Sequence, residues 1–276
     1  MVLPGQCRAF LLESDPRPLG WVSHDFATRL RGFPGVFDVS DKAVVLPARY
    51  EDFETRSQVL DDVLRHLQAA GEIPRWRNED YGVARQWGAP PLFRMERGAV
   101  PLFGVPAYGV HVNGFVRTAE GIRLWVGKRS ARKEVEPGKL DHLVAGGQPF
   151  GLGLLENVIK EAGEEAGVPA GLAAAARPVG AVRYICARSE GLRNDIAFCF
   201  DLELPEDFQP QPDGDEVESF ALWSVDAVLA RIRETDDFKF NVALVKLHFA
   251  LRHGLISPDD EPEYQAVVEG LAGRFE

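Results

Sequence analysis

Cysteine is scarce in this chain, and the few cysteines follow no pairing or metal-binding pattern. Three occur among 276 residues, at Cys7, Cys186 and Cys199. An odd number at these spacings excludes a disulfide-rich scaffold and matches no zinc or redox motif. We therefore expect reduced thiols and a cytoplasmic protein.

Long apolar runs are also missing from the sequence. It contains no stretch of about 18 consecutive apolar residues, so we expect no segment that crosses a membrane. The first residues lack a basic start followed by a long apolar core, and we expect no signal peptide.

Basic residues are fewer than acidic residues in this chain. The chain has 31 Lys and Arg against 42 Asp and Glu, which gives a formal net charge of −11. A net-acidic chain is a poor general binder of nucleic acid or of anionic membranes, so we expect neither as its partner, although a local basic patch stays open. The sequence leaves open whether the protein forms a homodimer. Hydrophobic residues make up 45% of the chain, enough to build a sizeable core.

The pattern along the chain changes near residue 105, and this change predicts two domains. Residues 1–105 are expected to form a small α+β unit, and residues 106–276 a larger one. The segment 87–106 is rich in Pro and Gly, which predicts a linker or an extended arm leading into the second unit.

Apolar periodicity predicts the elements of each domain. In the first, a helix is expected over residues 55–70, ending at Gly71, with a shorter helix over 25–30 and one or two strands over 37–46. In the second, alternation predicts strands over 110–118, 122–129, 176–188, 195–204 and 220–224. Helices are expected there over 154–166, 225–234, 241–253 and 262–273. Strands mixed with helices indicate a layered α/β or α+β fold.

The most informative segment is a glycine-rich loop that leads into the helix predicted over 154–166. Glu161, Glu164 and Glu165 stand three and four residues apart, so they project from one side of that helix. Like charges at this spacing destabilise an isolated helix, a cost that a bound divalent cation would offset. Hard cations such as Mg²⁺ prefer carboxylate and carbonyl oxygens, and glycines let the backbone approach. A solvated acidic face is the interpretation that spacing alone leaves open.

This segment resembles the Nudix box, G-x5-E-x7-R-E-U-x-E-E-x-G-U, in which U is apolar. The second half matches over KEAGEEAGV (160–168), with lysine in place of the usual arginine. Counting back places Gly146 at the first glycine and Leu152 at the first glutamate, so that carboxylate is missing and Glu156 is the nearest acid. The likeness extends over about residues 110–255.

More narrowly, the chain resembles the Nudix subgroup related to thiamin pyrophosphokinase, whose members share an additional N-terminal domain. The residues that carry this likeness are WRNEDYGV (76–83), PGKLDHLVAGG (137–147), LRNDIAFCFDLELP (192–205) and FKFNVALVKLHFALRHG (238–254). The resemblance implies a Nudix α/β/α sandwich with a mixed sheet, preceded by a small α+β domain.

The resemblance also implies a site for Mg²⁺ or Mn²⁺. Its ligands would be a backbone carbonyl near Gly146 and the carboxylates of Glu161, Glu164, Glu165 and Glu216. The three helix glutamates would be catalytic, with Glu164 as the preferred base. Lys160, at the arginine position, is expected to orient them.

Several further side chains are expected to contact the substrate. Arg129 ends a predicted strand where the family often places a phosphate-binding arginine, and a guanidinium suits phosphate. Arg132, Lys133 and Lys139 add positive charge in the adjoining loop, for which a solvated basic loop is the alternative. The remaining candidates are Gln148, Asp195, His142, Trp76 and Tyr81, the last two with a small core cluster as their alternative.

Together these features predict an enzyme, a Nudix-type hydrolase that cleaves a diphosphate joined to an organic group. The subgroup likeness suggests thiamin diphosphate or damaged analogues, cleaved to the monophosphate and phosphate. Two alternatives stay open. One is an isomerase of the isopentenyl-diphosphate type on the same fold. The other is a catalytically weak domain that senses a diphosphate ligand, suggested by Leu152 and Lys160.

Overall fold

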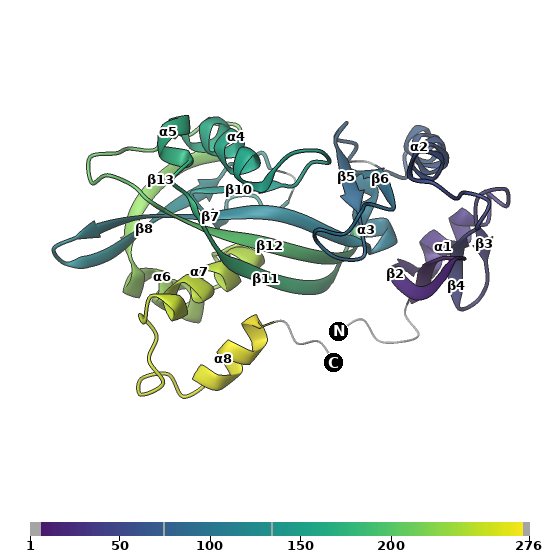
Figure 1. Cartoon of the computed structure of the whole chain (residues 1–276). Helices are drawn as coiled ribbons and strands as arrows, with labels where there is room; N and C mark the ends of the chain where they lie inside the picture. The colour runs from purple at the N-terminus through teal and green to yellow at the C-terminus, as the bar shows by residue number, and fades with distance from the viewer. Residues whose placement is uncertain (1–6, 74, 134, 273–276) are drawn as a thin grey trace. The chain divides into compact units, whose positions relative to one another are not determined.

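The computed structural model describes residues 7–73, 75–133 and 135–272, and these form two compact units (Figure 1). The first unit comprises the chain up to Ala107 together with two later segments, Pro149–Gly151 and Tyr184–Asp195. The second comprises Tyr108–Gln148, Leu152–Arg183 and the chain from Ile196 onward. The predicted domains were contiguous, so these two later segments had been placed in the second domain. Independent folding of residues 1–105 and 106–276 stays a prediction.

A four-stranded sheet and two helices make up most of the first unit. Its elements are β1 (Cys7–Leu12), β2 (Asp15–Ser23), α1 (His24–Leu30), β3 (Asp38–Val39), β4 (Ala43–Leu46), α2 (Phe53–Ala69), β5 (Asp80–Val83), β6 (Phe93–Glu96), a 3-10 turn (Arg97–Ala99) and α3 (Val100–Phe103). The sheet has the order β2-β1-β4-β3 and is mixed, because β1 pairs antiparallel with β2 and parallel with β4. The sequence did not predict β1, β2 or β5.

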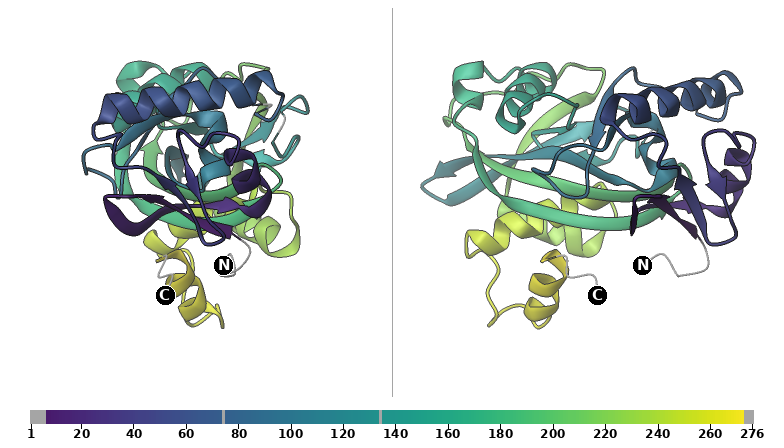
Figure 2. Two further views of the ribbon diagram at one scale, coloured as in Figure 1. Left: turned by 90° about the vertical axis from the view of Figure 1, so that its right-hand side faces the viewer. Right: turned by 45° about the vertical axis from the view of Figure 1, so that its right-hand side comes forward.

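Helix α2 confirms the helix predicted over 55–70 and is the long helix of this unit in Figure 2. It begins two residues earlier than predicted because Asp52 caps it, accepting hydrogen bonds from the Thr55 backbone N–H and hydroxyl, both at 2.8 Å. Its apolar stripe, which includes Leu60 and Leu64, is buried in the core of the first unit.

The linker predicted over residues 87–106 is wrong. This segment contains β6, the 3-10 turn and α3, and it places Phe93, Met95 and Phe103 in the core of the first unit. Phe103 packs edge-on against Phe10, with ring centroids 5.0 Å apart. The many prolines and glycines serve close turns here, so composition alone was misleading.

The second unit contains five helices and most of a seven-stranded sheet in the described chain, while residues 106–107 and 184–195, at the ends of three of its strands, belong to the first unit. Its elements are β7 (Pro106–Thr118), β8 (Gly121–Arg129), β9 (Leu140–Asp141), β10 (Val144–Gly147), α4 (Leu154–Ala166), α5 (Ala170–Ala173), β11 (Arg177–Arg188), β12 (Gly191–Glu203), β13 (Val217–Ser224), α6 (Val225–Glu234), α7 (Phe240–Arg252) and α8 (Tyr264–Leu271). The sheet order is β11-β12-β7-β8-β13, with β10 on β7 and β9 on β8. The predicted strands and helices of this domain are confirmed, although Gly273 of the last predicted helix lies outside the described residues.

Two apolar layers make this unit an α/β/α sandwich, which confirms the predicted fold class. On one face, Val158 and Ala162 of α4 pack with Val110 and Val112 of β7. On the other face, the helices α6 and α7 cover a core that includes Phe115 of β7. Figure 1 shows α4 and α5 on one side of the sheet and α6 and α7 on the other.

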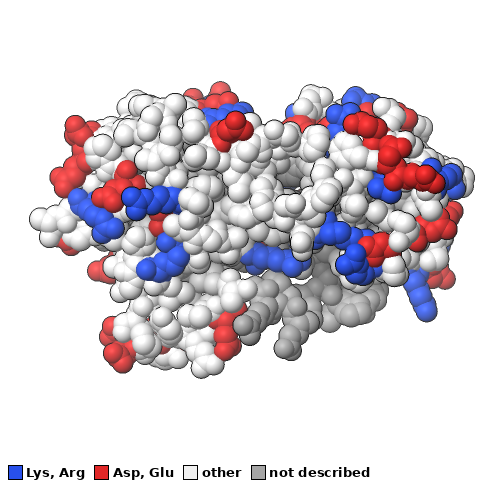
Figure 3. All heavy atoms as spheres, in the orientation of Figure 1, with Lys and Arg blue, Asp and Glu red and all other residues white. Residues whose placement is uncertain are grey.

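Charged side chains of both signs are interspersed on the face drawn in Figure 3, with wide uncharged areas between them. Within the described ranges, none of the helices has the length and apolar character needed to cross a membrane.

Candidate active site

Helix α4 carries the three glutamates, and local contacts fix both of its ends. The Glu156 carboxylate accepts a hydrogen bond from the Gly153 backbone N–H at 2.9 Å, which satisfies a free donor at the start of the helix. At the other end Gly167 adopts φ 60°, the left-handed conformation in which glycine commonly ends a helix. The helix therefore presents residues 161–165 in a defined orientation.

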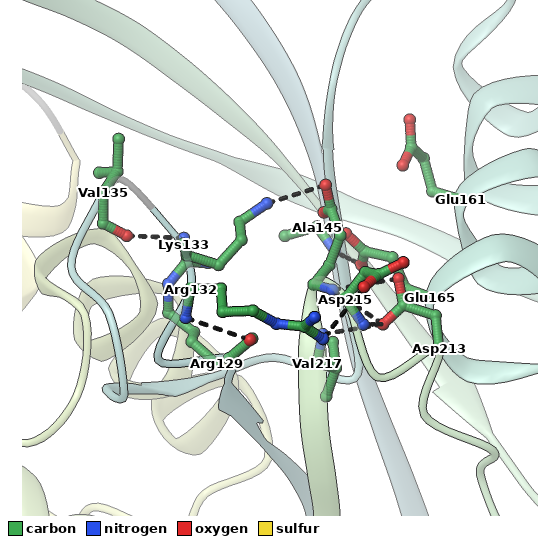
Figure 4. Close-up of polar contacts among 12 residues, drawn as sticks. Arg129, Arg132, Lys133, Val135, Ala145, Glu161, Glu165, Asp213, Asp215 and Val217 are labelled. Atoms are coloured by element: carbon green, nitrogen blue, oxygen red, sulfur yellow. Dashed lines mark hydrogen bonds and ion pairs between the residues drawn. The ribbon is translucent and has the colours of Figure 1, made fainter.

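Glu165 is the most buried of the three glutamates, with 8% of its surface exposed. Its carboxylate accepts a hydrogen bond from the Ala145 backbone N–H at 2.9 Å, so the helix side chain reaches strand β10 (Figure 4). Burial raises the pKa of Glu165 well above its usual value, and the nearby negative charges of Asp141, Glu161 and Glu216 raise it further. Several carboxylates thus share a small region that water reaches poorly.

Glu161 lies against the glycine that opens the box. A Cβ atom on Gly146 would fall 2.4 Å from the carboxyl carbon of Glu161, a separation that no side chain tolerates. Glycine at position 146 is therefore required for this carboxylate to approach strand β10. Glu164, in contrast, has 60% of its side chain exposed.

Lys160 forms ion pairs with two of these glutamates. Its ammonium group lies 3.2 Å from Glu161 and 2.7 Å from Glu164. Burial alone would lower the pKa of Lys160, but both carboxylates outweigh it and raise the pKa. This is the contact expected of a residue that orients the glutamates.

The acidic segment before β13 lies on the other side of the site. Glu216 forms an ion pair with Lys133 at 2.8 Å, and it is close enough to Glu165 to raise its pKa. Glu218 pairs instead with Lys128 at 3.2 Å. The strand register shifts between Val217 and Ser219, so a bulge interrupts the regular alternation of β13 next to Glu216 and Glu218.

The basic residues expected to hold phosphate are engaged with the protein itself. Arg129 is 9% exposed, forms a buried ion pair with Asp141, and donates to the carbonyls of Glu136 and Val135 at 3.1 and 2.8 Å. Each of its three nitrogens makes one of these contacts, so this arginine holds the loop in place. Two of its five N–H groups take no part in these bonds, and its phosphate-binding role stays a prediction.

The other basic side chains of this loop are more exposed. Arg132 donates to the Gly214 carbonyl at 2.6 Å and lies 3.0 Å from Asp215, with 71% of its side chain exposed (Figure 4). Lys139 lies 3.6 Å from Glu136, with 34% of its side chain exposed. These surface pairs are weak enough to exchange for a substrate phosphate.

Gln148 makes contacts within the protein, and its expected substrate contact stays a prediction. It is 5% exposed and donates through Nε2 to the Leu152 carbonyl at 2.6 Å. Its Oε1 accepts from Asn157 Nδ2 at 3.1 Å, and the same Asn157 group donates to the Gly147 carbonyl at 2.7 Å. No local pattern in the sequence predicts this Asn157 contact, because it joins a loop to a helix.

The structure brings Tyr81 and Asp195 into the first unit, together with Trp76. Tyr81 is 7% exposed, and burial raises its pKa, with a smaller contribution from Asp195. Asp195 accepts hydrogen bonds from the Tyr184 hydroxyl at 2.8 Å and from Arg193 at 3.3 Å. Trp76 donates to Asn78 at 2.9 Å and packs at the edge of the core.

A buried polar cluster in the second unit had no signal in the sequence. His142, expected to touch substrate, is 2% exposed and packs edge-on against His111, with ring centroids 5.0 Å apart. Burial lowers the pKa of His142 well below its usual value and lowers that of His111 to about 4. Lys246 of α7 is 1% exposed, and burial lowers its pKa to about 8. These side chains come from separate elements, so no spacing links them.

The donor set of the site fits a hard divalent cation. Within residues 7–73, 75–133 and 135–272, no three His, Cys, Asp or Glu side chains converge into a complete metal cluster. The carboxylates of Glu161 and Glu165 nevertheless flank the Gly146 backbone, and their oxygens are the ligands that Mg²⁺ and Mn²⁺ prefer. The repulsion among carboxylates that helps to raise the pKa of Glu165 is a feature that a cation would relieve.

Comparison with known proteins gives three kinds of match. A protein-family model described as a domain of unknown function (DUF4743) matches residues 4–107. Two curated proteins of Arabidopsis thaliana, Nudix hydrolase 20, chloroplastic, and Nudix hydrolase 24, chloroplastic, are each 41% identical to this chain, over 92% of it and 70% of their own length. An uncharacterized protein of Saccharomyces cerevisiae, YJR142W, is 32% identical over 88% of this chain and 75% of its own. The crystal structure of DR0079 from Deinococcus radiodurans, at 21% identity, aligns with a TM-score of 0.47 over 61% of this chain and 97% of that one.

Proposed function

This chain belongs to the Nudix hydrolase family, and from that premise we propose a divalent-metal-dependent hydrolase whose substrate is thiamin diphosphate or a damaged analogue. Membership supports the coarser statement directly: the protein is a Nudix-type hydrolase that cleaves a diphosphate. The substrate comes from the subgroup likeness, and the metal from the family's general use of divalent cations.

One observation carries the proposal, the arrangement of Glu161 and Glu165 about strand β10. Glu165 is held by the Ala145 N–H, and Glu161 fits against Gly146 only because that residue has no side chain. These two carboxylates would hold the cation, with Glu216 and Glu164 as further oxygen donors. Mg²⁺ or Mn²⁺ supplies charge neutralisation at the diphosphate and activation of a water.

The remaining residues have supporting tasks. Lys160 orients Glu161 and Glu164 through its two ion pairs. Glu164 is our candidate for the base, since it is the most exposed of the three glutamates and is accessible to water. Arg132 and Lys139 are the candidate phosphate contacts, because their present partners are exposed.

The first unit would supply selectivity for the organic group. A diphosphate is common to many metabolites, so discrimination requires contacts with the rest of the substrate. Tyr81, Asp195 and Trp76 combine aromatic rings with polar groups, the chemistry that a heteroaromatic ring needs. Placement of the enzyme in the cytoplasm stays a prediction, and the names of the two plant relatives place those proteins in the chloroplast.

A hydrolysis screen tests the substrate directly. The full chain is assayed with thiamin, nucleoside and sugar diphosphates, each with Mg²⁺, with Mn²⁺ and with a chelator. We expect metal-dependent release of phosphate and the highest kcat/KM for a thiamin-type diphosphate. A different best substrate would overturn the thiamin assignment alone. Tight binding of a diphosphate with no turnover would favour the ligand-sensing alternative.

A further inference from the structure

The loop between β10 and α4, residues 148–153, is held at its base by the second unit. The Gln148 side chain donates to the Leu152 carbonyl at 2.6 Å and so closes the loop on itself. Asn157 donates to the Gly147 carbonyl at 2.7 Å, where β10 ends. These contacts fix the two ends of the loop but none of its tip.

The tip of the same loop belongs to the first unit. Pro149–Gly151 are part of that compact unit, while the residues on either side belong to the second. The Phe150 backbone N–H donates to the Asp80 carbonyl at 2.8 Å. The Phe150 ring stacks on Phe53 of α2, with centroids 5.4 Å apart and an interplanar angle of 29°. Phe150 is therefore anchored by both its backbone and its ring.

A glycine makes room for this ring. A Cβ atom on Gly82 of β5 would lie 2.9 Å from Cδ2 of Phe150, so any larger residue there forces the ring to move. The backbone of Gly82 has no positive φ, which means that alanine at this position is a steric change only. Gly82 and Phe53 thus form a fitted seat for Phe150.

Phe150 lies next to the position at which this chain departs from the Nudix box pattern. The first glutamate position is Leu152, which carries no charge and cannot brace the box through an ion pair. Phe150 stands two residues before it and is fixed from outside the box. Ordering a loop backbone has a large entropic cost, so an external anchor that keeps the tip ordered has a substantial effect.

We propose that the first unit positions the catalytic loop by holding Phe150, and that Phe150, Phe53 and Gly82 are positioning residues for the hydrolysis. The proposal rests on the proposed function and deepens it, since it assigns the N-terminal unit a role in the rate as well as in selectivity. Loss of the anchor lets the loop and the start of α4 shift relative to strand β10. Misplacement by about 1 Å can cost as much as 10²-fold in rate.

The test uses the full chain and alters the seat without touching the box. In Gly82→Ala the new methyl group displaces the Phe150 ring. Gly35→Ala is the matched control, because a Cβ there meets nothing within 4 Å and Gly35 has no positive φ. We expect Gly82→Ala to lower kcat at least about tenfold while KM changes less than about threefold, the signature of an interaction made in the transition state only. Gly35→Ala should match the wild type.

Substitutions at Phe150 give the second arm. Phe150→Ala should reproduce the loss in kcat, whereas Phe150→Tyr keeps the stacked ring, and its added hydroxyl can point to solvent because Phe150 is 43% exposed. Phe150→Tyr should therefore restore activity. If Gly82→Ala fails to fold, the contrast between these two variants decides the question. Equal kcat in Phe150→Ala, Gly82→Ala and the wild type would overturn the proposal.

Hydrogen exchange provides a readout that does not depend on turnover. In Gly82→Ala and Phe150→Ala, amides of residues 148–156 should exchange faster than in the wild type, with the melting temperature of the whole protein little changed. Unchanged exchange would overturn the proposal even if the wild type hydrolysed no diphosphate. A wild type without hydrolase activity but with the expected exchange would reject the proposed function and retain the anchor.

Discussion

At the scale of single residues, the site concentrates negative charge where water is scarce. Glu165 is buried beside Asp141, Glu161 and Glu216, and these neighbours and its burial all raise its pKa. A protein that needed only stability would not keep such a group, because desolvated like charges oppose folding. The arrangement is understandable if the carboxylates serve a cation.

Removal of one of these carboxylate charges should therefore lower activity without lowering the stability of the folded protein. We expect Glu161→Gln and Glu165→Gln each to lower kcat at least about 10²-fold, because each removes a charged ligand from the ion that activates water. Without metal, both variants should be as stable as the wild type or slightly more so. Activity assays and urea unfolding measure the two effects.

Glu203→Gln is the control for these variants, since Glu203 is an exposed partner of Arg117 at 3.3 Å and such pairs contribute little. Its kcat and stability should stay near those of the wild type. Full activity in both Glu161→Gln and Glu165→Gln would reject the metal assignment.

The buried histidines should make stability depend on pH. Burial lowers the pKa of His111 to about 4 and that of His142 well below its usual value, so the unfolded chain binds more protons below about pH 6.5. Stability should be retained above that pH and fall as the pH decreases towards 4. For His111 alone the loss between pH 7.5 and 5 is about 2 kcal/mol.

Urea unfolding of the wild type and of His111→Gln across this pH range measures that loss. The variant cannot take up the proton, so its stability should depend less steeply on pH, whatever its stability at neutral pH. If the free energy of unfolding depends on pH equally in the two proteins, His111 does not titrate differently in the folded and unfolded states.

At the scale of elements, α4 and the loop before it show what a sequence can and cannot predict. Helix α4, its glycine stop and its acidic face follow from local spacing, and each is confirmed. The short strands β9 and β10 were missed because two to four residues carry too little periodicity. The ion pair of Arg129 with Asp141 joins β8 to β9, and no local pattern links these residues.

Contacts between residues far apart in the sequence were predictable only from the resemblance to the Nudix family. Spacing could place Glu161 and Glu165 on one side of a helix, but not the Ala145 N–H that holds Glu165. The bulge that changes the register of β13 between Val217 and Ser219 also has no signal in the local spacing. The Pro and Gly content of residues 87–106 led to the wrong prediction of a linker. These residues mark turns, but they do not show whether a segment is exposed or buried.

The two glycines that flank the acidic face give a matched pair of substitutions. In Gly146→Ala the added methyl displaces the Glu161 carboxylate, so we expect kcat to fall at least about tenfold with a small change in stability. Gly163→Ala lies within α4 in open space, and should raise stability by about 0.5–1 kcal/mol through helix propensity and leave kcat unchanged. Kinetics and urea unfolding of both variants check this. Wild-type kcat in Gly146→Ala would show that the position of Glu161 is not critical.

At the scale of the whole molecule, the question is what the first unit adds to a hydrolase. Its compact body includes Pro149–Gly151, which lie within the box, and Tyr184–Asp195, which follow it, so both segments lose their setting when residues 1–105 are removed. The unit is thus part of the enzyme's architecture and more than an appended module.

A chain that begins at Pro106 should therefore lose both rate and selectivity. We expect kcat/KM for the best substrate to fall at least about tenfold, which is ~1.4 kcal/mol of transition-state stabilisation. Discrimination among heteroaromatic diphosphates should narrow as well, because Trp76 and Tyr81 are absent. The same substrate panel measures both effects. An unchanged ranking of substrates would assign the first unit to another task, such as assembly.

The central claim is that this protein hydrolyses a diphosphate with a metal held by Glu161 and Glu165. The most direct measurement follows the products from the best diphosphate in isotopically labelled water, with Mg²⁺ present, by phosphorus NMR and mass spectrometry. The account predicts cleavage of the anhydride, one labelled oxygen in one of the phosphate products, and loss of the reaction with chelator and in Glu165→Gln. An isomerised product with the diphosphate intact, or turnover that persists in Glu165→Gln without metal, would contradict it.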